Sequence, residues 1–286
     1  MRKTSVVVDA AWVALSLAEH VGGKKLHALV AEFGDARAVL QADVSALRKV
    51  PGIGPKISQI IHNIDLADIE AAIPRWQDAG VSLLRDDDNA YPARPRELAD
   101  SPPTLFVRGV LPPQTERTVA IVGTRQPTPE AVEVAQRLAA QLVQRGCVIV
   151  SGLARGIDRE AHMAALSASG RTIAVLGSGV LNIYPPEHQS LADAIVLQGA
   201  LVSELNPDAS PSATYLVARN RLISGLSDAV IVVETSIDGG AMHAARWARQ
   251  QGRALYAVMS SASGNQALID EMGAKPLNPE TAYFKL

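Results

Sequence analysis

Apolar residues recur at helical spacing through the first quarter of the chain. From Ala10 to about Ile69 they fall three or four positions apart, which predicts a small all-α unit. Two turns in this stretch look alike, at residues 21–26 and 50–57, and each leads from glycine into a basic, amphipathic helix. We interpret them as two copies of one helical hairpin, of which the second is better formed.

The pattern changes after Asp78. Six prolines and the acidic run Asp86-Asp87-Asp88 interrupt the periodicity as far as Arg117, so we expect a connecting segment there. Within it, Leu105-Phe106-Val107 predicts a short edge strand, because the prolines on both sides discourage a longer one. The chain is thus expected to divide into a helical domain at residues 1–72, a linker or extension at 73–117 and an α/β domain at 118–286.

From Thr118 onward, short β-branched runs alternate with segments of helix length. Strands this apolar, separated by helices, predict a mostly parallel sheet that is covered on both faces. The fold class is therefore α/β, with a doubly wound sheet that follows the small all-α domain. The six expected strands lie at residues 119–122, 148–150, 172–176, 200–202, 229–233 and 254–258.

The overall charge excludes a globally basic protein. The formal net charge is -2 and the isoelectric point is about 6.3, so any nucleic-acid site must be local. Arginine outnumbers lysine by 20 to 7, which suits forked phosphate recognition, although a compositional drift toward alanine and arginine explains it equally well. The 4% aromatic content argues against a surface with many base-stacking platforms.

Several compartments and chemistries are excluded. The single cysteine, Cys147, forms no internal disulfide, and no basic-then-apolar leader follows Met1, so we expect a cytoplasmic protein. The longest apolar runs fall far short of the roughly 20 residues that span a bilayer, so no membrane insertion is expected. The dinucleotide, phosphate-loop and hydrolase-elbow fingerprints are absent, and one cysteine with six scattered histidines lacks zinc spacing. We expect no metal and no cofactor.

Glycine, hydroxyl and arginine residues follow the predicted strands. Because the carboxyl ends of parallel strands meet at one edge of a sheet, these residues form one crevice, and an anion such as phosphate would fit it. The loops are Gly123-Thr124-Arg125, Ser151-Gly152-Leu153-Ala154-Arg155-Gly156, Gly177-Ser178-Gly179, Ser203-Glu204 and Glu234-Thr235-Ser236. Gly177-Ser178-Gly179, taken alone, is more simply a strand terminator.

Asp158 and His162 stand four residues apart, so on a helix they share a face beside the second glycine loop. Acid/base catalysis by this pair is one interpretation. In the structural interpretation, which we favour, Asp158 caps the start of the helix and His162 packs or forms a local hydrogen bond.

These motifs, in this order, resemble the DprA/Smf family of DNA-processing proteins. The resemblance covers about residues 90 to 275. It rests on residues 120–125, on Ser151 to Asp158 with Ala161-His162, on residues 172–177 with Tyr184-Pro185, and on residues 219–227. It implies a Rossmann-like domain that binds single-stranded DNA, forms a homodimer and loads the RecA recombinase in natural transformation, without being an enzyme.

The resemblance also implies which residues contact DNA. The family's phosphate loop corresponds to Gly123, Thr124 and Arg125, its second loop to Ser151 through Asp158, and its Arg-Asn-Arg element to Arg219, Asn220 and Arg221. Arg171 stands where a basic residue before the third strand helps to line the DNA pocket. The full expected set is Gly123, Thr124, Arg125, Ser151, Gly152, Arg155, Gly156, Arg171, Gly177, Ser178, Arg219, Asn220 and Arg221.

The second glycine turn of the helical unit resembles a helix-hairpin-helix (SAM-like) motif. Such turns contact DNA phosphates through glycine N–H groups and a following lysine, here Gly52, Gly54 and Lys56, although related folds use them for protein contacts alone. The chain departs from the family at Leu216-Val217, at residues 238–243 and at Met259-Ser260. The C-terminal winged helix of many members is not expected in a sequence that ends at Leu286.

A second function remains open on the same fold. The α/β domain also resembles that of nucleoside-monophosphate phosphoribohydrolases, in which a glycine loop holds phosphate and a glutamate assists cleavage. Glu204 and Glu234 end strands and could serve in that role, either in an enzyme or in a nucleotide sensor, but the Pro-Gly-Gly-x-Gly-Thr signature is missing.

Overall fold

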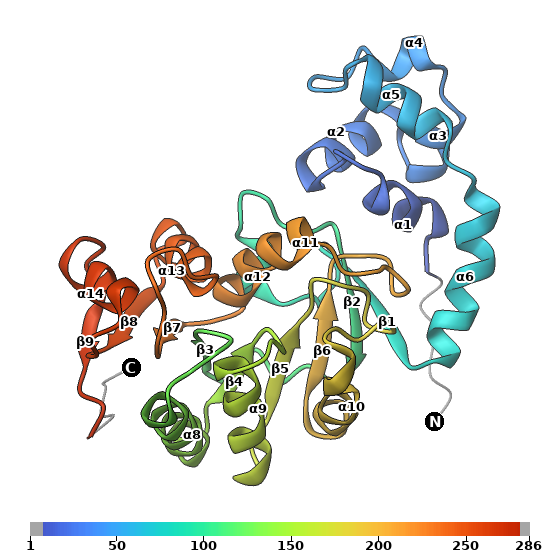
Figure 1. The fold of residues 1–286 in the computed structure, drawn as a ribbon. Coiled ribbons are helices and arrows are strands. Elements are labelled where there is room, and N and C mark those ends of the chain that lie inside the picture. Colours follow the sequence, from blue (N-terminus) through green and yellow to red (C-terminus); the bar gives the residue numbers. More distant parts are fainter. Residues whose placement is uncertain (1–7, 281–286) are drawn as a thin grey trace. The chain divides into compact units, whose positions relative to one another are not determined.

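A computed structural model describes residues 8–280 of the chain (Figure 1). The chain divides into two compact units, of which unit 1 holds residues 1–91 and 99–105 and unit 2 holds residues 92–98 and 106–286. The outer ends of the expected domains, residues 1–7 and 281–286, lie outside the described residues. The expected boundaries at residues 72 and 117 stay a prediction, because compactness alone does not test which parts fold independently.

Unit 1 is helical apart from one strand. Its elements are α1 (Ala10–Leu17), α2 (Gly23–Phe33), α3 (Ala36–Gln41), α4 (Val44–Leu47), α5 (Pro55–His62), α6 (Leu66–Asp78) and β1 (Val81–Arg85). Aspartate side chains cap three of the helices. Asp9, Asp35 and Asp65 accept hydrogen bonds from the first backbone N–H groups of α1, α3 and α6, which fixes where each helix begins.

The core of unit 1 forms around Trp12, which is buried among Leu15, Leu26 and Leu29. The indole Nε1 of Trp12 donates to the carbonyl oxygen of Pro103 over 3.2 Å, so its polar edge is satisfied although it is buried. The helices α4 and α5 and the glycine turn between them form the hairpin that the sequence predicts.

Unit 2 is built on a parallel sheet. Its elements are α7 (Ala93–Arg96), β2 (Thr104–Gly109, whose first two residues are counted in unit 1), β3 (Thr118–Val122), α8 (Pro129–Gln144), β4 (Val148–Ser151), α9 (Ile157–Ser167), β5 (Thr172–Val175), η1 (Pro186–His188), α10 (Gln189–Gln198), β6 (Ala200–Ser203), α11 (Ala213–Ala218), α12 (Asn220–Gly225), β7 (Ala229–Val232), α13 (Ala241–Gln250), β8 (Ala254–Val258), α14 (Ser263–Asp270) and β9 (Lys275–Leu277).

The strand order shows a doubly wound topology. The order is β1-β2-β6-β5-β4-β3-β7-β8-β9, in which β2 pairs with β6 antiparallel and every pairing from β6 to β9 is parallel. The chain lays down β3, β4, β5 and β6 toward one edge, then returns to the other side of β3 for β7, β8 and β9. The predicted fold class is therefore confirmed, and the switch point lies between β3 and β7.

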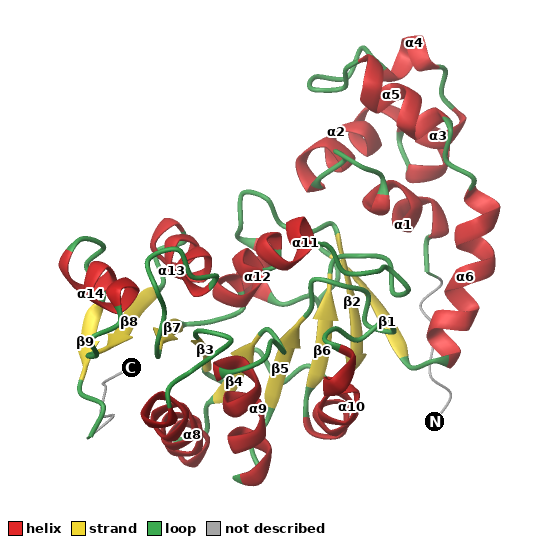
Figure 2. Cartoon of the chain, viewed as in Figure 1, coloured by secondary structure: helices red, strands yellow, loops and turns green. Residues whose placement is uncertain are grey.

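Helices cover both faces of the sheet (Figure 2). The stripe of α8 at Val134, Leu138 and Leu142 packs with α9 against Val119 and Ile121 of β3. Helices α12 and α13 pack on the opposite face, which is why both faces of each central strand are apolar. No helix in the described residues has the length and apolarity that a membrane span requires.

One strand differs from expectation, and two were not expected. The strand expected at Leu105-Phe106-Val107 is six residues long, and it is second in the order rather than at the edge, because β1 lies outside it. The sequence analysis did not identify β1 and β9, since Val81–Arg85 is largely exposed or half-buried and Lys275–Leu277 is only three residues long.

Truncation of the α8 stripe should destabilise unit 2 without altering its fold. We expect Leu138→Ala to lower the free energy of unfolding by about 2–5 kcal/mol, the usual effect of a cavity in a packed core. Urea denaturation followed by circular dichroism measures this. Glu133→Ala on the exposed side of α8 is the control and should change the free energy by less than about 0.5 kcal/mol. Equal effects of the two substitutions would contradict the packing described.

Candidate functional site

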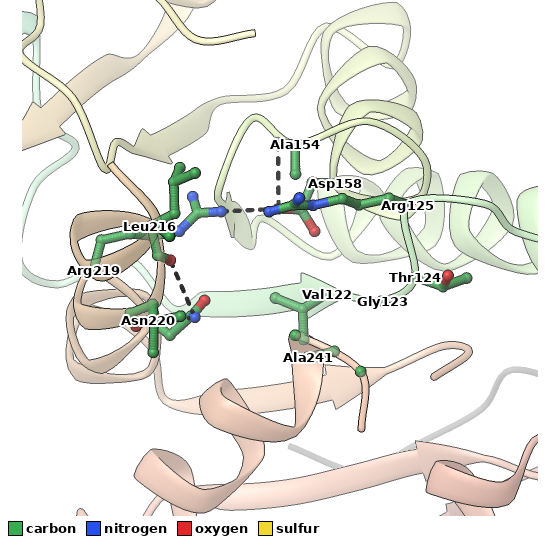
Figure 3. Close-up of a pocket in the computed structure, with 14 residues that line it drawn as sticks. Val122, Gly123, Thr124, Arg125, Ala154, Asp158, Leu216, Arg219, Asn220 and Ala241 are labelled. Carbon is green, nitrogen blue, oxygen red and sulfur yellow. Dashed lines mark hydrogen bonds and ion pairs between the residues drawn. The ribbon is translucent and has the colours of Figure 1, made fainter. Parts of the chain in front are cut away.

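A cavity of about 410 Å³ lies at the switch point of the sheet (Figure 3). The loops after β3, β4 and β7 form it together with α11 and the start of α12. Its lining residues are Val122, Gly123, Thr124, Arg125, Ala154, Asp158, Ala213, Leu216, Val217, Arg219, Asn220, Gly239, Gly240 and Ala241. Five of the thirteen residues expected from the sequence in this domain thus meet in one place: Gly123, Thr124, Arg125, Arg219 and Asn220.

Arg219 connects three parts of the cavity wall. It stands at the junction of α11 and α12, its side chain is 7% exposed, and its Nη1 donates to the carbonyl oxygens of Gly152 and Val175, the latter over 2.5 Å. Its Nη2 lies 3.7 Å from Oδ2 of Asp158. A Cβ atom at residue 152 would overlap the guanidinium group, so a larger residue there would displace Arg219. Arg219 therefore holds the ends of β4 and β5 against α11.

Asp158 is the second residue of α9 and does not cap that helix. Its Oδ2 accepts instead from the backbone N–H groups of Gly152 (3.1 Å) and Ala154 (3.4 Å), and the N-cap residue is Gly156. The expected capping role is therefore wrong in detail, because the carboxylate turns back onto the preceding loop. Burial raises the pKa of Asp158, while Arg219 and the two N–H groups act in the opposite direction.

The loop after β3 is fitted closely to the start of α9. The carbonyl oxygen of Thr124 accepts from the N–H of Ile157 (3.2 Å), and the N–H of Thr124 donates to the carbonyl oxygen of Glu234 (2.7 Å). Gly156 has a φ of +73°, and a Cβ there would overlap the Thr124 carbonyl. This close approach fixes the direction in which the loop enters the cavity.

Arg125 carries the uncompensated charge of the cavity. It is exposed, and within the described residues it has no carboxylate partner and no hydrogen bond. Asp158, by contrast, lies beside Arg219, and these two are the other charged side chains of the lining. The cavity therefore has a net charge of about +1, and Arg125 is free to contact an anion.

Arg155 lines a smaller recess beside the cavity. This recess is formed by Arg125, Gly152, Ala154, Arg155, Tyr184, Pro185, Leu216 and Arg219. Nε of Arg155 donates to Oε1 of Glu187 over 2.5 Å, and both side chains are largely exposed. Glu187 has a lowered pKa, first because of a backbone hydrogen bond and then because of Arg155.

Besides Gly156 and Arg171, four other expected residues lie outside the lining of both pockets. Ser151 is buried and donates to the carbonyl oxygen of Ile121 (2.6 Å), while Gly177 and Ser178 are buried, the former beneath Leu216. Arg221 pairs with Glu204, Nη2 to Oε2 at 2.5 Å. Ser151, Gly177 and Ser178 support the wall, and Arg221 ties α12 to the end of β6.

Arg171 lies at the opposite edge of the sheet. It precedes β5, so it stands at the amino end of a parallel strand whose carboxyl end faces the cavity. Its Nη1 pairs with Oε1 of Glu116 at 2.5 Å, and it lines a separate surface groove with Val110 and Leu197. The structure therefore does not bring Arg171 to the other expected residues.

His162 is buried beneath the site and forms the expected local hydrogen bond. Its Nδ1 lies 2.6 Å from Oγ1 of Thr172, which itself donates to the carbonyl oxygen of Ile149 (2.9 Å). The hydroxyl proton is thereby used, so Nδ1 of His162 is the donor. Burial, followed by the charges of Arg219 and His188, lowers its pKa from 6.5 to about 3, which keeps the ring neutral.

The residues of the second glycine turn lie in unit 1. Gly54 is the N-cap of α5, and Nζ of Lys56 is 2.9 Å from Nε2 of His20. Nζ of Lys25, from the first glycine turn, donates to the backbone oxygen of His20 over 3.0 Å. The two turns thus meet at His20, which also lies 3.0 Å from Glu19.

Gly239, Gly240 and Ala241 line the cavity but were not identified as site residues from the sequence. They stand at the start of α13, where the first backbone N–H groups have no partner within the helix. The paired glycines after the fifth strand run were the available signal. No group of three or more His, Cys, Asp or Glu side chains in residues 8–280 could hold a metal ion.

Comparison with models of protein families identifies one that matches this chain. The model for DNA recombination-mediator protein A matches residues 82–285. Protein Smf of Synechocystis is 35% identical over 264 residues, which are 91% of this chain and 66% of that protein. This chain therefore spans just under two thirds of that relative.

Two solved structures are also similar. The X-ray structure of DNA processing protein A from Streptococcus pneumoniae has a TM-score of 0.81 at 27% identity, covering 98% of this chain and 99% of that one. A structure that describes the single-stranded DNA binding mode of DNA processing protein A from Helicobacter pylori has a TM-score of 0.63 at 31% identity, covering 70% and 93%.

The pKa of His162 predicts how stability depends on pH. A ring that stays neutral when folded, but has a pKa of 6.5 when unfolded, contributes stability above pH 6.5 that is lost as the pH falls toward 3. Relative to His162→Gln, the wild type should therefore lose about 2 kcal/mol of unfolding free energy between pH 7.5 and pH 5. Urea denaturation at the two pH values measures the difference, and parallel pH profiles would contradict the assignment.

Proposed function

The chain belongs to the DNA recombination-mediator protein A family, and from that premise we propose that it binds single-stranded DNA in the crevice at the switch point. The expected resemblance to the DprA/Smf family is thereby confirmed. The proposed role is to protect incoming single strands and to promote loading of the RecA recombinase during natural transformation.

The observation that carries the proposal is the unneutralised guanidinium of Arg125. In the described part of the chain it has no acidic partner, and it lines the 410 Å³ cavity beside the start of α13. A cation and the start of a helix at one cavity favour an anionic ligand. The formal charge of -2 over the whole chain provides no global attraction, so the affinity for DNA depends on local sites such as this crevice.

The crevice offers groups that contact the sugar-phosphate backbone of DNA rather than the edges of its bases. Glycine loops, the hydroxyl of Thr124 and the guanidinium group of Arg125 fit phosphate oxygens, whereas Arg155 is paired with Glu187. Arg219 and Asn220 hold the wall through bonds to backbone carbonyls and are proposed to act mainly by positioning. The binding should therefore be largely independent of DNA sequence. The similar structure from Helicobacter pylori supports this ligand, since it describes a single-stranded DNA binding mode of that protein.

Family membership alone supports the proposed partners and location. We propose a homodimer that presents the bound strand to RecA, in the cytoplasm, without assigning residues to either protein interface. No catalytic step is proposed.

The nucleoside-monophosphate alternative is less well supported. The two glutamates that could act as catalysts are both engaged: Glu234 accepts from the N–H of Thr128 (2.9 Å), and Glu204 pairs with Arg221. Neither glutamate lines the cavity. The cavity would still suit the phosphate of a nucleotide, but neither glutamate is free to assist cleavage.

Substitution of Arg125 tests the proposal. Because one phosphate contact on a single strand releases about 0.7 counterion, Arg125→Gln should weaken binding and make the slope of log K against log salt shallower by about 0.7. Fluorescence anisotropy of a labelled oligodeoxythymidine over a salt series measures both quantities. Arg171→Gln is the matched control, at the far edge of the sheet, and should leave the slope unchanged.

The possible outcomes separate the two functions. Salt-sensitive binding that depends on Arg125 supports DNA in the crevice. If the wild type fails to bind the oligonucleotide at low salt, or if Arg125→Gln binds with an unchanged slope, the assignment is wrong. Release of free base from nucleoside monophosphates would favour the enzymatic alternative.

We also propose that Gly52, Gly54 and Lys56 of unit 1 contact DNA phosphates. Lys25 and Lys56 meet at His20 beside the glycine turn, which gathers two ammonium groups on one surface. Lys56→Gln should lower the magnitude of the salt slope by about 0.7 if this surface binds DNA. Arg37→Gln, at an exposed ion pair with Glu70 in the same unit, is the control. Identical slopes for the two variants would leave unit 1 without a DNA contact.

A further inference from the structure

Exposed aromatic side chains are rare in this protein. Among residues 8–280, those that are more than one third exposed are Tyr184 at 39% and Tyr215 at 43%. Trp12, Trp76 and Tyr91 are fully buried. Tyr91 shows how a structural tyrosine is held here, since its hydroxyl donates to the carbonyl oxygen of Pro102 over 2.7 Å. Within the described residues, the Tyr184 side chain has no such bond, so the fold does not explain its position.

Tyr184 lines the recess next to the cavity, and Tyr215 does not. The recess also contains Arg125, Arg155, Pro185 and Leu216. Arg125 lines the cavity as well, so the two spaces share this side chain. A ligand held by Arg125 in the cavity is therefore adjacent to the ring of Tyr184.

The charges divide the recess into two ends. Arg155 is neutralised by Glu187, and the neighbouring Pro185 and Leu216 are apolar, so this end has little net charge. Arg125 has no acidic partner in the described chain, so the positive charge is at the other end. A phosphate is therefore favoured at Arg125, and Glu187 disfavours a second phosphate near Tyr184. A flat, uncharged group is what the Tyr184 end accommodates.

We propose that Tyr184 is a base-stacking residue that lets the crevice distinguish single-stranded from duplex DNA. This inference rests on the proposed function. With a phosphate on Arg125, the attached nucleoside places its base over the exposed ring of Tyr184. A base in a duplex is stacked and paired and cannot reach the ring, whereas a base in a single strand can. Stacking tolerates every base, because each has a π-face.

The test compares the affinity of Tyr184 variants for labelled oligodeoxythymidine by fluorescence anisotropy. Tyr184→Leu should weaken binding by about 5- to 100-fold, the range for loss of one stacked base, with an unchanged salt slope because no phosphate contact is lost. Tyr184→Phe retains the ring and should stay within about twofold of the wild type. Leu197→Ala, at an 85% exposed apolar residue of α10, is the control and should not alter binding.

An abasic oligomer of the same length separates stacking from a structural effect. On this oligomer the ratio of wild-type to Tyr184→Leu affinity should fall to about one, since there is no base to stack. A ratio that stays the same on both oligomers would mean that Tyr184 acts by shaping the recess, and the inference would be wrong.

The outcomes also distinguish failure of this inference from failure of the proposed function. If Tyr184→Leu binds like the wild type while Arg125→Gln binds with a shallower slope, the crevice holds DNA without stacking on Tyr184. If the wild type does not bind single strands at low salt, the proposed function itself fails. If Tyr184→Leu leaves the affinity for a duplex competitor unchanged but removes the preference for single strands, the inference is supported.

Discussion

The site depends on one buried guanidinium group. Arg219 donates to the carbonyl oxygens at the ends of β4 and β5 and lies beside the carboxylate of Asp158, so it joins two strand ends, one loop and the α11–α12 junction. A buried charge with these bonds cannot be replaced without leaving carbonyl oxygens and a carboxylate unpaired. The shape of the cavity wall therefore follows from interactions made inside the protein, away from any ligand.

This arrangement explains why so few of the arginines near the site are available to an anion. Arg155, Arg219 and Arg221 each lie beside a carboxylate. Such pairing is consistent with a net charge of -2 and concentrates the positive potential at Arg125. A ligand attracted by one free cation and by backbone N–H groups is held by its phosphates. Specificity must then come from another feature, and the exposed ring of Tyr184 is available for it.

Much of this could be predicted from the sequence. The β-branched runs and the helical periods between them determine the doubly wound sheet, because only a sheet covered on both faces buries strands that are apolar on both sides. The parallel topology in turn brings the loops after β3 and β4 to one edge, which is why Gly123, Arg125 and Gly156 could be grouped before any coordinates. The order of the motifs along the chain indicated the family, and the match to the family model confirms it.

The tertiary structure decided where each side chain lies and which partner it has. Sequence spacing does not show that Arg171 pairs with Glu116, or that Asp158 turns back onto the loop instead of capping α9. Nor does it show which arginine lacks a carboxylate, because Glu187, Glu204 and Glu116 reach their partners from other elements. The sequence by itself determined the sheet and the loops at its edge, since both follow from local hydrophobic pattern. Charge pairing is non-local, and only the folded chain fixes it.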